Sequence, residues 1–246
     1  MRDLLAAEFL KLRTVRTPWA LLVTTVTLSG LAVASTVLVA DSAGIDLESA
    51  NGARDVLGVS VAGAIFVLVL GIIISAGEYR HGTAIDTFLT TPRRPRVIAV
   101  KLATALTTGG IFGLLASGTA LATALLMYRV RDLGFPLGPS TSWSTLGATA
   151  LYAALFCGIG AATGSLVRNQ VVAIVGWLSW MAVVEHIAEG FFPSFGRWLP
   201  MGAGRALVGG IGTPDLLSPA TAAVVLIAYA AVIMAAAIVW ERYRDA

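Results

Sequence analysis

Between Asp55 and Glu78 the sequence reads VLGVSVAGAIFVLVLGIIISAG, a run of more than twenty residues without one charged side chain. A helix rises about 1.5 Å per residue, so about twenty apolar residues cross the hydrocarbon core of a bilayer, which is about 30 Å thick. A shorter run would be more typical of a core helix in a soluble protein. This stretch is long enough to span a membrane.

Similar runs occur along the whole chain. Hydrophobic residues make up 57% of its 246 residues and charged residues only 13%, which is far more apolar than a soluble domain. The pattern predicts an all-α membrane protein with a single transmembrane domain over residues 1–246. We expect six spans, at 18–40, 56–77, 97–127, 144–167, 170–190 and 219–240.

Two span boundaries carry helix-start signals. Thr17 precedes Pro18, and Ser218 precedes Pro219. In each pair a residue suited to capping is followed by proline at the first helical position, where the missing N–H costs nothing. The fifth span has the least distinct end, because charged residues follow its apolar part.

Basic residues predict how the chain is oriented. With the N-terminus inside, most of the 17 lysines and arginines fall on the inner side, as the positive-inside rule requires. We therefore expect a multi-pass protein of the cell inner (plasma) membrane with cytoplasmic N- and C-termini. The net charge of +3 reflects this topology and does not point to nucleic acid.

The first 17 residues predict a helix that lies along the inner surface. Leu5, Phe9, Leu12 and Val15 recur at helical spacing, although Glu8 intrudes on the apolar stripe. Contact with membrane lipid follows from this interpretation. The alternative is a solvated tail that only satisfies the positive-inside rule.

Residues 78–96 form the most basic connection and predict a second short helix. Glu78 lies where a helix N-terminus would favour an anion, and Thr91, Pro92 and Pro95 end the helical pattern. The arginines around these prolines suit phosphate headgroups or an acidic protein surface.

Several short strings resemble the membrane subunits of type-2 ATP-binding-cassette (ABC) transporters, the six-span ABC exporter permeases. They are Ala7-Glu8-Phe9-Leu10-Lys11-Leu12, Glu78-Tyr79-Arg80-His81-Gly82-Thr83, Thr91-Pro92-Arg93-Arg94 leading to Lys101, Gly164-Ser165-Leu166-Val167-Arg168-Asn169, and Gly196-Arg197-Trp198-Leu199-Pro200. The resemblance covers nearly the whole chain through topology, and its motifs are concentrated between Glu78 and Lys101.

The resemblance implies a division of labour between subunits. The first helix would be a connecting helix, residues 78–96 would hold a coupling helix, and residues 191–218 would form an outer re-entrant region. Partners would be two ABC ATPase subunits and a second permease copy or similar chain, with ATP and Mg on the ATPases. The implied function is efflux of a small-molecule, peptide or lipid-like cargo. Implied contacts with the ATPase are Glu8, Lys11, Glu78, Tyr79, Arg80, Gly82, Thr83, Arg93 and Arg94.

A structural alternative remains for the second helix. Glu78 could cap it, Gly82 could permit a bend, and the arginines could bind lipid.

The sequence itself argues against an ATP site of the phosphate-binding-loop type on this chain. Such a loop needs glycines that wrap the phosphates, followed by a lysine. The two lysines, Lys11 and Lys101, follow leucine and valine, and neither ends a glycine-rich loop. We expect a non-catalytic subunit with no cofactor of its own.

Glu185, His186 and Glu189 are the one group that invites a chemical interpretation. The helical pair of histidines that a zinc hydrolase needs is absent, so we predict neither a catalytic residue nor a metal site. A polar cluster at a helix end is one interpretation, and a translocation pathway or outer gate is another. Trp177 and Trp180 could add an aromatic face to that pathway, or could simply pack between helices.

Two other classes of function stay open: a stand-alone ion-coupled carrier or channel, and a membrane enzyme. All 14 carboxylates lie in loops, tails or at span ends, which disfavours proton coupling. Within the spans, Gly109 and Gly113, and also Gly160 and Gly164, have the spacing that lets helix backbones approach closely. Cys157, the single cysteine, is expected to fill the core.

Overall fold

A computed structural model of the protein describes residues 2–82, 94–209 and 216–243, and every regular element in these ranges is a helix. The elements are α1 (Arg2–Thr14), α2 (Arg16–Ala43), α3 (Ala50–Gly58), η1 (Val59–Gly63), α4 (Ala64–His81), α6 (Arg94–Val130), α7 (Pro139–Val167), α8 (Gln170–Ser179), η2 (Trp180–Glu185), α9 (His186–Phe191), α10 (Pro193–Gly196), α11 (Pro200–Val208) and α12 (Pro219–Tyr243).

The six predicted spans are confirmed as helices long and apolar enough to cross a membrane. Their bounds are Arg16–Ala43, Ala50–Arg80, Arg96–Val130, Pro139–Val167, Gln170–Phe191 and Pro219–Trp240. The third is longer than the predicted range 97–127 because the helix starts among the arginines and ends beyond Tyr128. The protein is thus a multi-pass helical membrane protein.

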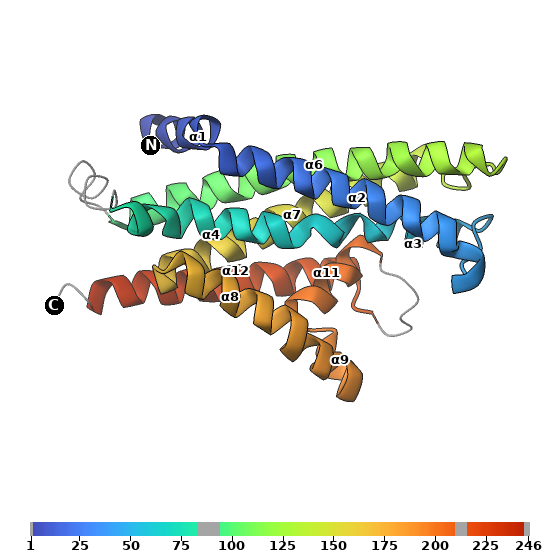
Figure 1. Cartoon of the computed structure of the whole chain (residues 1–246). Coiled ribbons are helices and arrows are strands. Elements are labelled where there is room, and N and C mark those ends of the chain that lie inside the picture. Colours follow the sequence, from blue (N-terminus) through green and yellow to red (C-terminus); the bar gives the residue numbers. More distant parts are fainter. Residues whose placement is uncertain (1, 83–93, 210–215, 244–246) are drawn as a thin grey trace.

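The helices run roughly along one direction, and the N-terminal helix and the C-terminal end of α12 lie at the same end of the bundle (Figure 1). We call this the terminal end. The last turn of α4 and the first turn of α6 also lie there, whereas α3 and α11 lie at the opposite end. The six spans therefore alternate in direction along the chain.

Helix α7 forms the centre of the bundle, packed between α4, α6 and α12. Its close contacts depend on glycine, as the small-residue spacing predicts. A Cβ added at Gly160 would clash with the backbone oxygen of Leu68 in α4, and one at Gly113 would meet the backbone of Ala150 in α7. Cys157 is fully buried in the same core. These contacts hold α4, α6 and α7 together without large side chains between them.

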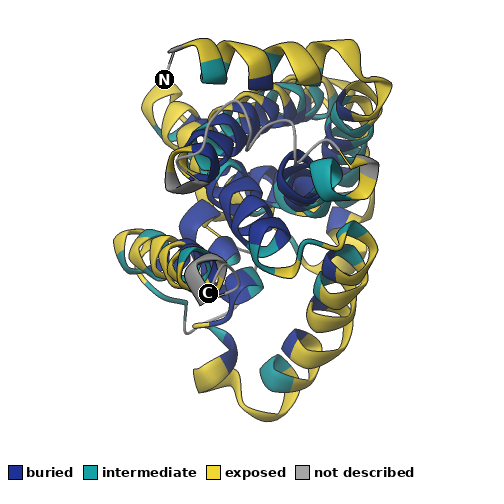
Figure 2. Cartoon of the chain, turned by 90° about the vertical axis from the view of Figure 1, so that its left-hand side faces the viewer, coloured by how far each residue is buried: buried dark blue, intermediate teal, exposed yellow. Residues whose placement is uncertain are grey.

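Large apolar side chains cover the outside of the molecule. Val23, Leu31, Leu126 and Val232 are each more than half exposed. Figure 2 shows the buried residues inside the bundle and exposed ones around it. A soluble protein would not expose so much apolar surface, so lipid or other membrane protein has to cover it.

The fifth span diverges from the bundle. Helix α8, the π-helical turn η2 and α9 continue one another and run away from α12 toward the opposite end (Figure 1). Asn169 caps α8 by accepting hydrogen bonds from the N–H groups of Val171 and Val172. A π-helical turn adds a residue to the helical register and is frequent at functional sites.

Three local predictions differ in outcome. Ser218 accepts a hydrogen bond from Thr221 N at the start of α12, as predicted. The prediction for Thr17 is wrong, because α2 already begins at Arg16 and Val15 precedes it without a side-chain cap. The placement of Glu78 at a helix N-terminus is also wrong, because α4 continues through it to His81.

Candidate functional site

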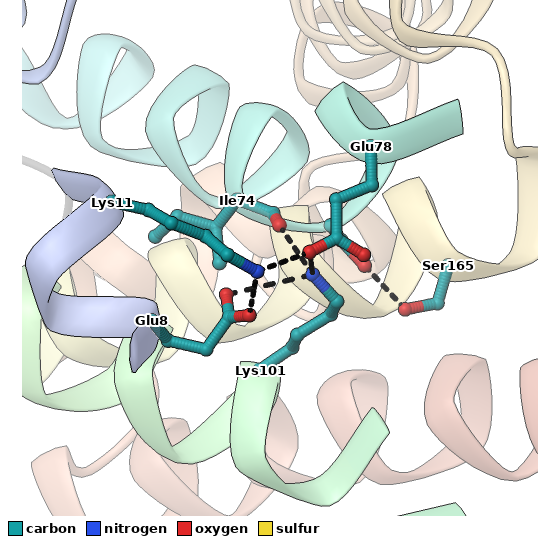
Figure 3. Close-up of polar contacts among 7 residues, drawn as sticks. Glu8, Lys11, Ile74, Glu78, Lys101 and Ser165 are labelled. Carbon is teal, nitrogen blue, oxygen red and sulfur yellow. Dashed lines mark hydrogen bonds and ion pairs between the residues drawn. The ribbon is translucent and has the colours of Figure 1, made fainter. Parts of the chain in front are cut away.

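Four charged side chains meet at the terminal end of the bundle (Figure 3). Glu8 and Lys11 come from α1, Glu78 from the last turn of α4, and Lys101 from the second turn of α6. The side chains of Glu8, Glu78 and Lys101 are only 7%, 11% and 6% exposed, so three of the four charges are withdrawn from solvent. Both lysines of the chain take part.

The two positive and two negative groups alternate. Lys11 Nζ lies 2.6 Å from Glu8 Oε1 and 2.6 Å from Glu78 Oε1. Lys101 Nζ lies 3.0 Å from Glu78 Oε1 and 3.5 Å from Glu8 Oε2. Each ammonium therefore contacts both carboxylates, and the cluster as a whole is neutral.

Alternation makes the burial of these charges tolerable. Removing an ion from water costs several kcal/mol of solvation free energy. Attraction to well-placed opposite charges in a poorly solvated site offsets a similar amount. Lys101 donates a further hydrogen bond to the backbone oxygen of Ile74, at 3.2 Å. Each charge contacts two opposite charges, so loss of one member leaves an excess charge of one sign in a mostly buried cluster.

Lys11 is the most exposed member of the cluster. Partial burial acts to lower its pKa, but its hydrogen bonds to Glu78 and Glu8 outweigh that effect and raise the pKa above the ordinary value of 10.5. Lys11 therefore keeps its positive charge at neutral pH, as the two carboxylates require.

The cluster joins helices that are distant in the sequence. Glu8 and Lys101 lie 93 residues apart, and Lys11 and Glu78 lie 67 apart. Ser165 of α7 points toward Glu78 in Figure 3, and its hydroxyl is also hydrogen-bonded to that of Ser75 in α4. The cluster thus fixes α1 to α4 and α6, the two spans on either side of residues 83–93.

Three of the other residues predicted to contact an ATPase, Tyr79, Arg80 and Gly82, lie directly after Glu78 at the end of α4. Tyr79 is half-buried, and the guanidinium carbon of Arg168 lies 5.3 Å from the centre of its ring. Arg80 is exposed. Gly82 ends α4 in a left-handed conformation, with φ of 71°, and its N–H bonds to Glu78 O.

The remaining interface predictions fall partly beyond what the structure covers. Thr83 and Arg93, with most of the predicted 78–96 helix, lie outside the described residues. Arg94 begins α6, and its side chain is likewise outside them. Their contact with an ATPase stays a prediction.

A second polar group lies at the opposite end, on the fifth span. Glu185 is fully buried, and its Oε2 accepts a hydrogen bond of 2.7 Å from Met201 N in the first turn of α11. The indole of Trp180 also interacts with this carboxylate. Glu189 forms an ion pair with Arg205 of α11. The fifth span is thereby attached to α11 through two carboxylates.

A cavity of about 480 Å³ adjoins this group. Its wall is mainly apolar, built from residues 61–65, α8, η2 and the first turn of α11. Its polar lining comes from His186, Glu189, Arg205 and Tyr152. His186 Nδ1 is within 3.1 Å of Met181 O, which holds the ring against its own helix.

The predicted aromatic face of Trp177 and Trp180 is divided between two environments. Trp177 packs on the main core, and its Nε1 donates to Thr163 Oγ1 at 3.0 Å. Trp180 is 40% exposed and lies on the π-helical turn, beside Glu185. Neither tryptophan lines the cavity, so the two do not form one continuous surface there.

The structure adds Lys101 and Arg205 to the predicted site residues. Lys101 carried a usable signal, since it lies inside the predicted span 97–127 and a cation in a span needs a partner. Arg205 had no comparable signal, because its partner depends on how α11 folds back on the fifth span. Within the described residues no three His, Cys, Asp or Glu side chains are grouped as a metal site would need.

Comparison of the chain with protein-family models, with curated proteins and with solved structures found no match.

Proposed function

We propose that this protein is the permease subunit of an ATP-driven ABC exporter and forms half of its translocation pathway. In this proposal the terminal end faces the cytoplasm, a second copy or similar chain completes the pathway, and two separate ATPase subunits supply the energy. The motif resemblance and the six-span helical architecture support the proposal. Because neither lysine of this sequence ends a glycine-rich loop, the proposal assigns ATP hydrolysis to separate ATPases.

The observation that carries the proposal is the buried cluster of Glu8, Lys11, Glu78 and Lys101. It attaches α1 to the two spans that flank residues 83–93. Such an attachment would let α1, α4 and α6 move as one body when a partner displaces the connection. A flexible junction would absorb the displacement before it reached the spans.

In the mechanism we propose, α1, α4 and α6 move together as one rigid body. ATP-driven closure of the ATPases would push on residues 83–93 and on exposed Arg80, and the cluster would pass the motion to α1, α4 and α6. The tilt of these helices would open the pathway to the outside, near the cavity beside Glu189. Helices α10 and α11 would then be the outer re-entrant region that the resemblance implies.

One observation favours a second candidate, an ion-coupled carrier. Glu185 is close to the end of its span, as expected, but it is fully buried, unlike the carboxylates of a simple helix end. A buried carboxylate inside a span is a common element of ion-coupled transport. A carrier would transport without any ATPase, which separates the two candidates experimentally.

The test is transport in reconstituted vesicles. The chain is purified with a co-expressed ABC ATPase and compared with the chain alone and with an ATPase whose phosphate-binding lysine is replaced. The proposal predicts ATP-dependent flux only in the first preparation. Flux by the lone chain along an ion gradient would favour the carrier, and failure of every ABC ATPase to associate would contradict the permease function.

A further inference from the structure

The lining of the cavity beside α9 changes from apolar to polar along the fifth span. Leu178 and Met181 line it near the middle of the span, whereas His186 and Glu189 line it near the end. Arg205 of α11 belongs to the polar part. Because the ends of a span lie at the membrane surface, the apolar part of the cavity lies deeper in the membrane than the polar part. This order matches an amphiphile, whose chain lies in the hydrocarbon and whose headgroup lies at the surface.

The size of the cavity suits one hydrocarbon chain. Its volume of about 480 Å³ lies within the range of about 300–1,000 Å³ that is usual for pockets of drug-sized ligands. The lining residues Leu178 and Glu189 are 11 positions apart, which corresponds to roughly 16 Å along a helix. A single chain therefore fits better than the two chains of a membrane phospholipid.

The two charged side chains of the lining are paired with each other. Glu189 and Arg205 form an ion pair, and their side chains are 26% and 37% exposed. The hydrogen bond between them uses one nitrogen of the guanidinium and one oxygen of the carboxylate. The guanidinium has further N–H donors and the carboxylate a second acceptor oxygen. The pair therefore offers donors and acceptors side by side, while its two charges cancel.

A headgroup without charge suits this pair best. An ionic headgroup would meet one like charge and one opposite charge, so it would gain little to offset its loss of hydration. A hydroxyl group can donate to Glu189 and accept from Arg205, and it loses much less hydration than an ion.

We propose that this cavity binds single-chain amphiphiles with an uncharged hydroxyl headgroup, the chemistry of a monoacylglycerol. The chain would lie against the apolar wall and the hydroxyls against Glu189 and Arg205. The inference rests on the proposed function only in taking these amphiphiles as the exported cargo. Binding itself requires no ATPase.

Photolabelling tests where such a ligand lies. A monoacylglycerol with a diazirine at the end of its chain is photolysed with the purified full chain in nanodiscs, and mass spectrometry locates the adducts. We expect saturable labelling concentrated on the apolar wall, within residues 61–65 and 178–182. Labelling spread evenly over exposed apolar residues of other spans, such as Val23 and Val232, would overturn the proposal.

Competition tests the headgroup. Unlabelled monoacylglycerol should displace the probe at a concentration about tenfold lower than the fatty acid or the alkylamine with the same chain. Equal displacement by the three compounds would contradict an uncharged hydroxyl headgroup as the preferred one.

Filling the cavity should remove the binding. Ala182→Phe and Ala62→Phe place a ring in it from opposite walls, and each should reduce saturable labelling by about tenfold or more. Val175→Phe is the control, because Val175 is exposed on the same span and does not line the cavity. Thermal unfolding identifies the variants that are folded. Unchanged labelling in either folded cavity variant would contradict the inference.

Removing one charge of the pair should change the selectivity. Glu189→Gln leaves the guanidinium of Arg205 without its carboxylate. The fatty acid should then displace the probe about tenfold better than it does from the unmodified protein, and the alkylamine should not. Unchanged selectivity in this variant would show that the headgroup does not lie at the pair.

The outcomes also separate this inference from the proposed function. Saturable labelling of the cavity without ATP-driven flux would leave the site intact and refute the exporter. ATP-driven flux of another cargo, with no labelling of the cavity, would refute the site and leave the exporter.

Discussion

Lys101 Nζ in α6 lies 3.0 Å from Glu78 Oε1 in α4, at the ends of the two spans that flank residues 83–93. Their side chains are only 6% and 11% exposed. Any displacement of this connection must therefore either move both helices together or separate a buried ion pair.

Loss of Lys101 should strongly destabilise the protein. Lys101→Met leaves Glu8 and Glu78 with only Lys11 between them, and breaking a buried pair costs about 3–5 kcal/mol. The free energy of unfolding in detergent measures the effect. Arg129→Met is the control, since Arg129 is exposed near the other end of α6 and should change stability by less than about 0.5 kcal/mol.

A second substitution should recover part of that loss. Glu8→Gln in the Lys101→Met background removes the surplus negative charge and leaves Lys11 paired with Glu78. The double variant should be more stable than Lys101→Met alone. If the double variant lost as much stability as Glu8→Gln and Lys101→Met lose together, Glu8 and Lys101 would not interact.

The cluster should also weaken at high pH. The pKa of Lys11 is raised in the folded protein, so its contribution to stability is complete below pH 10.5, the ordinary value, and is lost as pH rises through the folded pKa. Unfolding temperatures in non-ionic detergent between pH 9 and 12 measure this loss. Lys11→Met lacks the contribution and should lose less stability over the same interval. If the unfolding temperatures of the unmodified protein and of Lys11→Met fell equally between pH 9 and 12, Lys11 would not contribute to this loss of stability.

Replacement of Gly160 in α7 should destabilise the protein, because this glycine packs against the backbone of α4. Gly160→Ala would force Cβ onto Leu68 O and should cost about 1–3 kcal/mol. Gly147→Ala, in the same helix, meets nothing within 4 Å and should instead stabilise by about 0.5–1 kcal/mol. A similar effect at both positions would show that α7 does not pack on α4 through Gly160.

The hydrogen bond between the fourth and fifth spans should be measurable. Trp177→Phe removes the bond from Nε1 to Thr163 Oγ1 and should cost about 0.5–1.5 kcal/mol. Trp143→Phe, at a tryptophan that is 70% exposed, is the matched control and should have little effect. Equal losses would leave no special role for the contact with Thr163.

The spans could be predicted from the sequence because their signal is local. Twenty apolar residues have one stable arrangement in a bilayer, so the run from Val56 to Gly77 indicates a span without knowledge of its neighbours. The glycine pairs likewise mark close helix contacts in advance. The sequence does not show that Gly160 packs against α4, because that contact depends on the arrangement of the whole bundle.

The sites were less predictable because their partners are distant in the sequence. Glu8 interrupts the apolar stripe of α1, and the structure gives the reason: its carboxylate lies against Lys101, 93 residues away. Glu185 follows an apolar span and resembles a helix-end residue in the sequence. Its burial depends on the π-helical turn and on α11, and no local pattern specified either one.

The central claim is that the terminal end transmits work from a separate ATPase. Cross-linking tests this claim most directly. Single cysteines replace exposed Arg80 at that end and exposed Ser140 at the opposite end, in a Cys157→Ser background, and the chain is co-expressed with an ABC ATPase. The account predicts that Arg80→Cys cross-links to the ATPase and that Ser140→Cys does not. Labelling of Arg80→Cys from outside intact cells, with no cross-link to any ATPase, would contradict it.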